Sequence, residues 1–247
     1  MNRPHRLPAV FLRGMLMGAA DVVPGVSGGT IAFITGIYER LIGALASFNG
    51  ATVKQLLAGQ YKSFWSAIDG SFLLVLFSGI LLSVFSLASF IDAALNSVPH
   101  LVWSLFLGLV LASALYLVRK LTDHRFWQLV PLGAGLLTAL AISLAPPLAN
   151  PAASAWLLLP AGALGICAMV LPGISGSFIL LLLGMYQPLL TAVKTFDLVS
   201  LGYFALGCVL GLLSFVHLLK WLLNRYHDTT ITVLTGFLLG ALPIKGG

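Results

Sequence analysis

Two short segments of the chain combine proline, glycine and hydroxyl side chains in the same order. Residues 23–38 read VPGVSGGTIAFITGIY, and residues 171–186 read LPGISGSFILLLLGMY, with seven of the sixteen positions identical. Proline stops helix propagation, and glycine permits a tight turn whose backbone amides face a cavity. Free amides at a helix start, its positive dipole end and nearby hydroxyls together form an anion site. The paired motifs therefore predict a binding site for an anion such as phosphate.

The residues expected to contact this anion lie at the turns of the two motifs. Arg40 is the predicted cationic contributor, because a guanidinium group matches the geometry of phosphate. Arg13 is a second cationic candidate, although it could equally anchor the chain at the membrane surface. The alternative for the small residues is that they only allow helices to pack closely. Besides Arg40, the predicted binding residues are Pro24, Gly25, Ser27, Gly28, Gly29, Thr30, Gly173, Ser175, Gly176 and Ser177.

Two carboxylates beside the first motif have no counterpart in the second. Asp21 aligns with Met169, and Glu39 aligns with Gln187. A carboxylate at a buried helix C-terminus faces an unfavourable dipole, so Asp21 should be protonated or paired with a cation. We therefore predict that Asp21 couples transport to protons, with Glu39 as the secondary candidate. The competing explanation is that Asp21 caps the turn amides and stays ionised at all times.

The composition indicates a membrane protein. Of the 247 residues, 59% are hydrophobic and 8% are charged, and the mean hydropathy is +1.03. Average proteins carry about 25% charged residues. No metal-ligand spacing, nucleophile elbow or Walker loop is present, so the sequence predicts no catalytic residue, metal or cofactor. Cys167 and Cys208 lie in apolar segments and are expected to be buried, reduced thiols.

Four uninterrupted apolar segments have the length of about 20 residues that a bilayer crossing requires. These predicted spans are residues 71–91, 99–118, 127–148 and 199–222. A fifth apolar segment, within residues 229–247, is short for a span and is followed by the final PIKGG. Its shortness is consistent with a longer native chain.

The apolar segments around the two motifs are too short to cross a bilayer. Residues 9–21 and 30–38 flank the first turn, and residues 155–170 and 178–193 flank the second. Twelve helical residues extend about 18 Å, against a hydrocarbon core of about 30 Å. We therefore predict two re-entrant helical hairpins, at residues 9–40 and 155–193.

These segments predict an all-α polytopic membrane protein built from inverted-topology repeats. The first repeat comprises residues 1–126, a connector span follows at 127–148, and the second repeat comprises residues 155–247. Each repeat contains a re-entrant hairpin followed by two spans. Because a single connector separates the repeats, the hairpins should enter from opposite faces. Inverted repeats place the substrate at their interface, near the midplane.

The basic residues support a cytoplasmic N-terminus. With this topology, eleven Lys and Arg residues fall on the cytoplasmic side and only Lys194 and Lys245 fall outside. Such asymmetry is the positive-inside signal of membrane proteins. Because the basic residues are sorted by leaflet, nucleic-acid binding is not indicated.

The first motif and its surroundings resemble a known family. The run ADVVPGVSGGTIAFITGIYERLI at residues 20–42, preceded by RGMLMGA, is similar to the signature of the bacterial polyprenyl-phosphate transporters, formerly a domain of unknown function. The second motif resembles that family's second copy. The resemblance implies a bacterial cytoplasmic-membrane protein, not an enzyme. It also implies that undecaprenyl phosphate, a C55 lipid phosphate, is returned to the cytoplasmic leaflet, where it carries precursors of peptidoglycan and other envelope polymers.

Two other functions are compatible with the residues alone. A channel or ion-coupled transporter for a small soluble anion would use similar turns, but it would need a water path on both sides. A membrane lipid phosphatase would need a nucleophile and a general acid or base, for which only Asp21 and the serines are available near the turns. The expected partners are the lipid phosphate and membrane lipids. The sequence leaves the oligomeric state open, with a homo-oligomer as one option.

Overall fold

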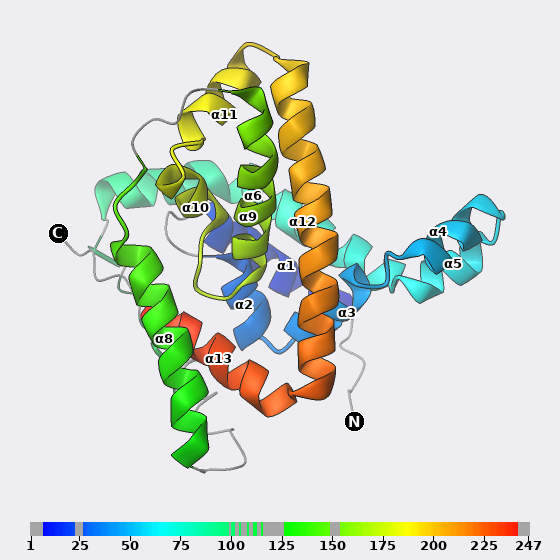
Figure 1. The fold of residues 1–247 in the computed structure, drawn as a ribbon, viewed down its shortest axis with the longest axis horizontal. Coiled ribbons are helices and arrows are strands. Elements are labelled where there is room, and N and C mark those ends of the chain that lie inside the picture. The colour runs from blue at the N-terminus through cyan, green and yellow to red at the C-terminus, as the bar shows by residue number, and fades with distance from the viewer. Residues whose placement is uncertain are drawn as a thin grey trace. The chain divides into compact units, whose positions relative to one another are not determined.

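The computed structural model of the protein is helical throughout the part of the chain that it describes (Figure 1). It describes residues 7–22, 27–98, 126–148 and 154–241, together with positions 100, 101, 104, 108, 111, 112 and 115. The chain divides into two compact units, Met1–Leu117 and Val118–Gly247. The all-helical fold class is thereby confirmed for the described residues.

Among the helices of the first unit whose bounds are described, one is long and five are shorter, and the most extensive contact is between the first and the last of them. α1 lies along α6, while α4 and α5 form an arm that extends away from this pair (Figure 1). The elements are α1 (Leu7–Val22), α2 (Gly28–Ile34), α3 (Tyr38–Leu45), α4 (Gly50–Leu57), α5 (Tyr61–Ala67) and α6 (Gly70–Ser97).

Small residues allow α1 to approach α6. A Cβ atom added at Gly14 would fall on the carbonyl oxygen of Leu76, and one added at Gly79 would fall on that of Phe11. At Gly18 the added atom would lie 2.5 Å from the carbonyl oxygen of Ile80. Close backbone approach of this kind stabilises helix pairs in lipid, where no hydrophobic effect drives association.

The second unit is built from two long helix pairs. α9 lies along α12, and α8 lies along α13. Glycines again form the contact, because a Cβ atom at Gly207 would fall on the Leu159 carbonyl oxygen and one at Gly135 on that of Val233. The elements are η1 (Phe126–Gln128), α8 (Leu129–Leu144), η2 (Ala155–Leu157), α9 (Leu158–Val170), α10 (Gly176–Leu182), α11 (Tyr186–Lys194), α12 (Leu198–Arg225) and α13 (His227–Gly240).

The two cysteines reinforce the α9–α12 contact. The Cys208 thiol donates to the Gly162 carbonyl and the Cys167 thiol donates to the Gly211 carbonyl, each at 3.5 Å between sulfur and oxygen. Both cysteines are free and half-buried. Both thiols are thus less buried than the sequence predicted, and each also makes a polar contact.

Each predicted hairpin contains a second helix break, which shortens the predicted returning arm. The sequence predicted returning arms at residues 30–38 and 178–193, whereas α2 ends at Ile34 and α10 ends at Leu182. Gly36 and Gly184 follow in the left-handed region, with φ of 75° and 68°. Glycine adopts this conformation without the steric cost of a side chain, so it ends helices efficiently. At the second break, α10 and α11 are inclined by 106°.

Most of the predicted spans coincide with helices. Residues 71–91 lie within α6, 199–222 lie within α12, 127–148 overlap α8, and the predicted 229–247 segment overlaps α13. Among the described residues, α12 is long and apolar enough to cross a membrane, and the bent pairs α5–α6 and α10–α11 qualify if each is one span. Most of the predicted span at residues 99–118 lies outside the described residues.

The glycine contact between α9 and α12 can be tested with a matched pair on one helix. Gly207→Ala should destabilise the protein by about 1–3 kcal/mol, as overpacking usually does, because the new methyl group would meet the Leu159 carbonyl. Gly202→Ala should be neutral, since nothing lies within 4 Å of its added Cβ. Thermal unfolding in detergent measures both variants, and equal melting temperatures would contradict the packing.

Candidate anion-binding site

The first tip, residues 23–30, begins α2 with an ordered N-cap. Ser27 has an extended backbone, and its hydroxyl oxygen accepts from the Gly29 amide at 3.1 Å. Its carbonyl accepts from the Thr30 amide at 2.9 Å. The Ser27 and Thr30 side chains are both buried. Pro24 and Gly25, which the sequence also predicted for this site, lie outside the described residues.

The Asp21 side chain caps the first amide of α2 in the first tip. The Gly28 amide donates to Oδ1 of Asp21 at 2.6 Å between nitrogen and oxygen. The carboxylate also packs over the glycine, since a Cβ atom at Gly28 would lie 2.5 Å from Oδ2 of Asp21. A hydrogen bond from an amide to a carboxylate is shorter and stronger than one to a neutral acceptor. Asp21 therefore stands at the amide where a bound anion was expected, as the capping explanation required.

The second tip, residues 171–177, is arranged differently. Ser175 is the N-cap of α10, but its side chain makes no capping hydrogen bond. Its hydroxyl instead lies 2.8 Å from the Ser177 hydroxyl, and this contact is exposed. Gly173 turns the chain with φ of 89°, and an added Cβ there would lie 2.8 Å from the Phe237 carbonyl oxygen of α13.

Equivalent positions pack against each other in both tips, but with different chemistry. Gly176 aligns with Gly28, and a Cβ atom at Gly176 would lie 3.3 Å from Cβ of Met169. Met169 aligns with Asp21. The first tip thus presents a carboxylate to the opening amide of its helix, whereas the second tip has a methionine at the aligned position. Within the described residues, the Ser175 and Ser177 hydroxyls of the second tip contact each other in an exposed position, and Ser175 makes no side-chain cap.

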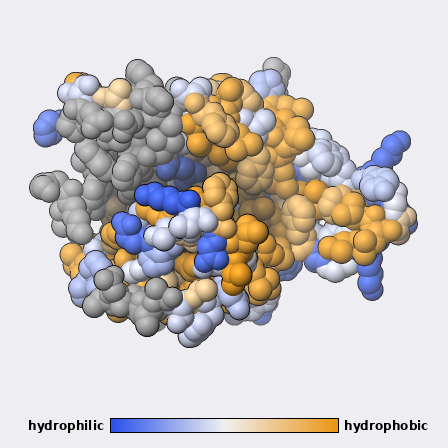
Figure 2. Space-filling model, turned by 90° about the horizontal axis from the view of Figure 1, so that it is seen from above, coloured by the Kyte–Doolittle hydropathy of each residue, from blue (hydrophilic) through white to orange (hydrophobic). Residues whose placement is uncertain are grey.

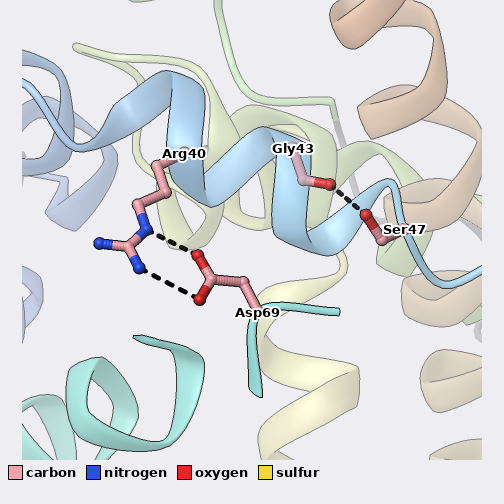
Figure 3. Close-up of polar contacts among 4 residues, drawn as sticks. All are labelled: Arg40, Gly43, Ser47 and Asp69. Atoms are coloured by element: carbon pink, nitrogen blue, oxygen red, sulfur yellow. Dashed lines mark hydrogen bonds and ion pairs between the residues drawn. The ribbon is translucent and has the colours of Figure 1, made fainter. Parts of the chain in front are cut away.

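Arg40 forms an ion pair outside the first tip. Figure 3 shows its guanidinium against Asp69, with Nε 2.6 Å from Oδ2 and Nη2 3.1 Å from Oδ1. The guanidinium also lies over the Phe72 ring, with Cζ 4.3 Å from the centroid. Arg40 is on α3, beyond the break that ends α2. The ion pair connects α3 to the start of α6. Just beyond the end of α3, the Ser47 hydroxyl donates to the Gly43 carbonyl (Figure 3).

The other charged candidates lie elsewhere in the first unit. Glu39 is exposed in the first turn of α3. Nη1 of Arg13 is buried and has no hydrogen-bond partner among the described residues. Asp69 was missed by sequence reasoning, because its partner Arg40 lies 29 residues away on another helix. In the described part of the chain, no group of three His, Cys, Asp or Glu side chains could hold a metal ion.

Helices that are broken at glycine-rich turns and expose apolar faces are the features of a helical membrane protein. The chain belongs to the family described as undecaprenyl phosphate translocase-like, whose model matches residues 17–244. This family is one of transporters and not of enzymes. No solved structure matches the chain.

Two curated relatives cover nearly the whole chain. A polyprenyl-phosphate transporter of Vibrio cholerae is 49% identical over 235 residues, which are 95% of this chain and 76% of the relative. A polyprenyl-phosphate transporter of Staphylococcus aureus is 29% identical over 254 aligned residues, covering 94% of this chain and 83% of the relative.

The ion pair between Arg40 and Asp69 can be measured by a double-mutant cycle. Arg40→Ala, Asp69→Ala and the double variant should show a coupling energy of about 1 kcal/mol, at the upper end for partly exposed pairs. The bidentate geometry and the Phe72 ring restrict the guanidinium, which favours this upper value. The free energy of unfolding is measured in mixed micelles for the wild type, the two single variants and the double variant. Additive single effects would show that the pair does not stabilise the fold.

Proposed function

We propose that this protein carries a polyprenyl phosphate, specifically undecaprenyl phosphate, across the bacterial cytoplasmic membrane. The lipid moves from the outer to the cytoplasmic leaflet, and this movement recycles the carrier lipid for peptidoglycan synthesis. The observation that carries the proposal is the alignment of two polyprenyl-phosphate transporters with 95% and 94% of this chain. The N-terminus lies in the cytoplasm, in agreement with the distribution of Lys and Arg.

The physical task explains why a protein is needed. A polyprenyl tail remains in hydrocarbon throughout, but its phosphate is a charge that costs several kcal/mol at the bilayer centre. A transporter must therefore surround the head group with polar atoms while leaving the tail in lipid. Two glycine-rich tips within the membrane supply backbone amides and hydroxyls for this purpose, without any covalent step.

Corresponding contacts in the two units support an internal repeat. Gly14 and Gly162 occupy the same position relative to their motifs. Each packs on a carbonyl of the long helix that follows, Leu76 for Gly14 and Phe204 for Gly162. The breaks match as well, since Ile37 donates to Ala32 at 3.0 Å as Met185 donates to Leu180 at 2.9 Å. We take these units as inverted repeats with re-entrant hairpins.

The head group binds at the tips, with unequal roles for the two. In the second tip, Ser175 and Ser177 donate to phosphate oxygens, while Gly173 and Gly176 allow the turn that presents backbone amides to the phosphate. In the first tip the Asp21 carboxylate occupies the Gly28 amide. Once Asp21 withdraws, phosphate binds there through Ser27, Gly29 and Thr30, beside the sequence positions of Pro24 and Gly25.

Cationic side chains complete the proposed site. Arg40 contributes after exchanging Asp69 for phosphate, because both acceptors suit the same bidentate geometry. Arg13 contributes through Nη1, whose buried donor has no partner among the described residues. A buried donor without an acceptor is costly, and a phosphate oxygen would relieve that cost.

Asp21 links protons to the lipid phosphate by competition. As a carboxylate it holds the Gly28 amide, and as a neutral acid it is a weaker acceptor, so protonation releases the amide. Phosphate binding at the first tip and proton uptake by Asp21 therefore favour each other. Moving one negative charge inward against an inside-negative potential costs about 2.3 kcal/mol per 100 mV, and one proton per charge removes this cost. Glu39 is the secondary proton site.

The function is tested by a leaflet-resolved flipping assay with purified protein in proteoliposomes. Undecaprenyl phosphate should equilibrate between leaflets at least tenfold faster than in protein-free vesicles. A neutral polyprenol is the control lipid, because without a phosphate it does not need the head-group site. Uptake of a labelled soluble anion without lipid flipping would identify a soluble-anion transporter instead, and release of inorganic phosphate would identify a phosphatase.

Asp21→Asn tests the proton coupling. Asparagine keeps the side-chain shape and an oxygen acceptor for the Gly28 amide, but it cannot titrate. We expect flipping by this variant to lose most of its pH dependence, while the wild-type rate falls as the pH rises and Asp21 stays ionised. Asp228→Asn is the control, because that carboxylate is exposed near the start of α13 and contacts His227. A wild-type pH profile in Asp21→Asn would refute coupling through Asp21.

A further inference from the structure

The surface arm, comprising α4 and α5 at residues 50–67, has no counterpart in the second unit. Asn49 caps α4 through the Ala51 and Thr52 amides, and Asp197 caps α12 through the Val199 and Ser200 amides. Asn49 and Asp197 occupy equivalent positions relative to the two motifs. In the second unit the long helix starts at once, whereas in the first unit the arm intervenes before α6. An addition confined to one unit calls for a role of its own.

The arm exposes an apolar face. Val53, Leu56 and Leu57 share one side of α4, because residues spaced by three and four lie together on a helix. Leu57 is 82% exposed, and Tyr61 on α5 is 68% exposed. Figure 2 shows the arm at the right, with hydrophobic surface beside hydrophilic side chains. Such a large share of exposed apolar side chains on two short helices indicates a surface that something apolar covers.

The charge of the arm specifies what covers it. Residues 50–67 contain Lys54 and Lys62 but no Asp or Glu. Both lysines are exposed beside the apolar face. Tyr61 and Trp65 add amphipathic rings of the kind enriched at the boundary between lipid head groups and hydrocarbon. Apolar, aromatic and basic residues on short helices are the combination that binds an anionic lipid surface. A symmetric contact between the arms of two copies would bring lysines against lysines.

The angle between α5 and α6 fits such a surface. The two helices are inclined by 66°. If α6 crosses the membrane, α5 therefore lies closer to the membrane plane than to its normal. Trp65 fixes this bend, since its Nε1 donates to the Ser71 hydroxyl at 3.0 Å and its ring covers Gly70. A side chain at residue 70 would collide with that ring.

We propose that the surface arm lies flat on an anionic lipid leaflet, at the membrane face where α6 begins. The stripe of Val53, Leu56 and Leu57 enters the boundary between head groups and acyl chains. Lys54 and Lys62 contact lipid phosphates by charge. The arm thereby anchors the first unit in the plane of the leaflet, with Trp65 as the fixed corner between surface helix and spanning helix.

Spin labelling of the full chain tests this arrangement. A nitroxide label is attached to Leu57→Cys in protein that also carries Cys167→Ala and Cys208→Ala. The labelled protein is reconstituted in vesicles of phosphatidylglycerol and phosphatidylcholine. Ser63 is the control position, because it is exposed on the side of α5 opposite to Tyr61. Oxygen should relax the label at residue 57 more than an aqueous nickel chelate does, and the reverse should hold at residue 63. If the protein without its native cysteines does not fold, a nitroxide amino acid is incorporated at residue 57 of the chain that retains Cys167 and Cys208.

Removing charge should weaken the contact. Lys54→Gln with Lys62→Gln, or vesicles of phosphatidylcholine alone, should lower the oxygen-to-nickel contrast at residue 57 at least twofold. Lys194→Gln, on the exposed end of α11, should leave that contrast unchanged. Nickel access at residue 57 equal to that at residue 63 would overturn the proposal, because the arm would stand in water. Protection from both reagents that rises with protein density would also overturn it, in favour of contact between copies.

Discussion

The requirement that every backbone amide be satisfied within hydrocarbon governs this structure. A helix interrupted inside a membrane exposes its opening amides, and each unsatisfied group there costs several kcal/mol. The first tip meets this requirement with its own Asp21 carboxylate, which accepts from Gly28 at 2.6 Å. The second tip places Met169 at the equivalent position and turns the hydroxyls of Ser175 and Ser177 outward. This difference between otherwise similar tips underlies our account of head-group binding and proton coupling.

Close packing of backbones supports the tips. Lipid offers no hydrophobic driving force between helices, so the pairs α1–α6 and α9–α12 depend on direct contact at glycines. Gly14 and Gly162 each precede a tip by the same number of residues. The contact at these glycines therefore sets where each tip lies along its long helix. The arm of α4 and α5, which only the first unit carries, changes the surface without changing this register.

Local signals in the sequence predicted the helix ends at the two motifs, whereas contacts between residues far apart in the sequence were not predicted. Proline and glycine at the motifs marked the ends of α1 and α9, because their backbone preferences act within a few residues. Gly36 and Gly184 carried the same kind of signal at aligned positions, yet their apolar neighbours favoured one continuous arm. The pairing of Arg40 with Asp69 was beyond prediction, since it depends on how α3 meets the start of α6. The sequence is compatible with two roles for Asp21, proton coupling and capping of the turn amides. Only the structure shows that its carboxylate accepts from the Gly28 amide.

The most direct test of the central claim is the affinity of the protein for a lipid phosphate when the second-tip hydroxyls are removed. Native mass spectrometry can titrate undecaprenyl phosphate onto the wild type and onto Ser175→Ala/Ser177→Ala. Ser78→Ala/Ser86→Ala is the matched control, because these exposed hydroxyls donate to carbonyls of their own helix. Hydrogen bonds to a charged group contribute about 1.5–3 kcal/mol, so the second-tip variant should bind at least tenfold more weakly and the control should match the wild type. Wild-type affinity in Ser175→Ala/Ser177→Ala would contradict the account.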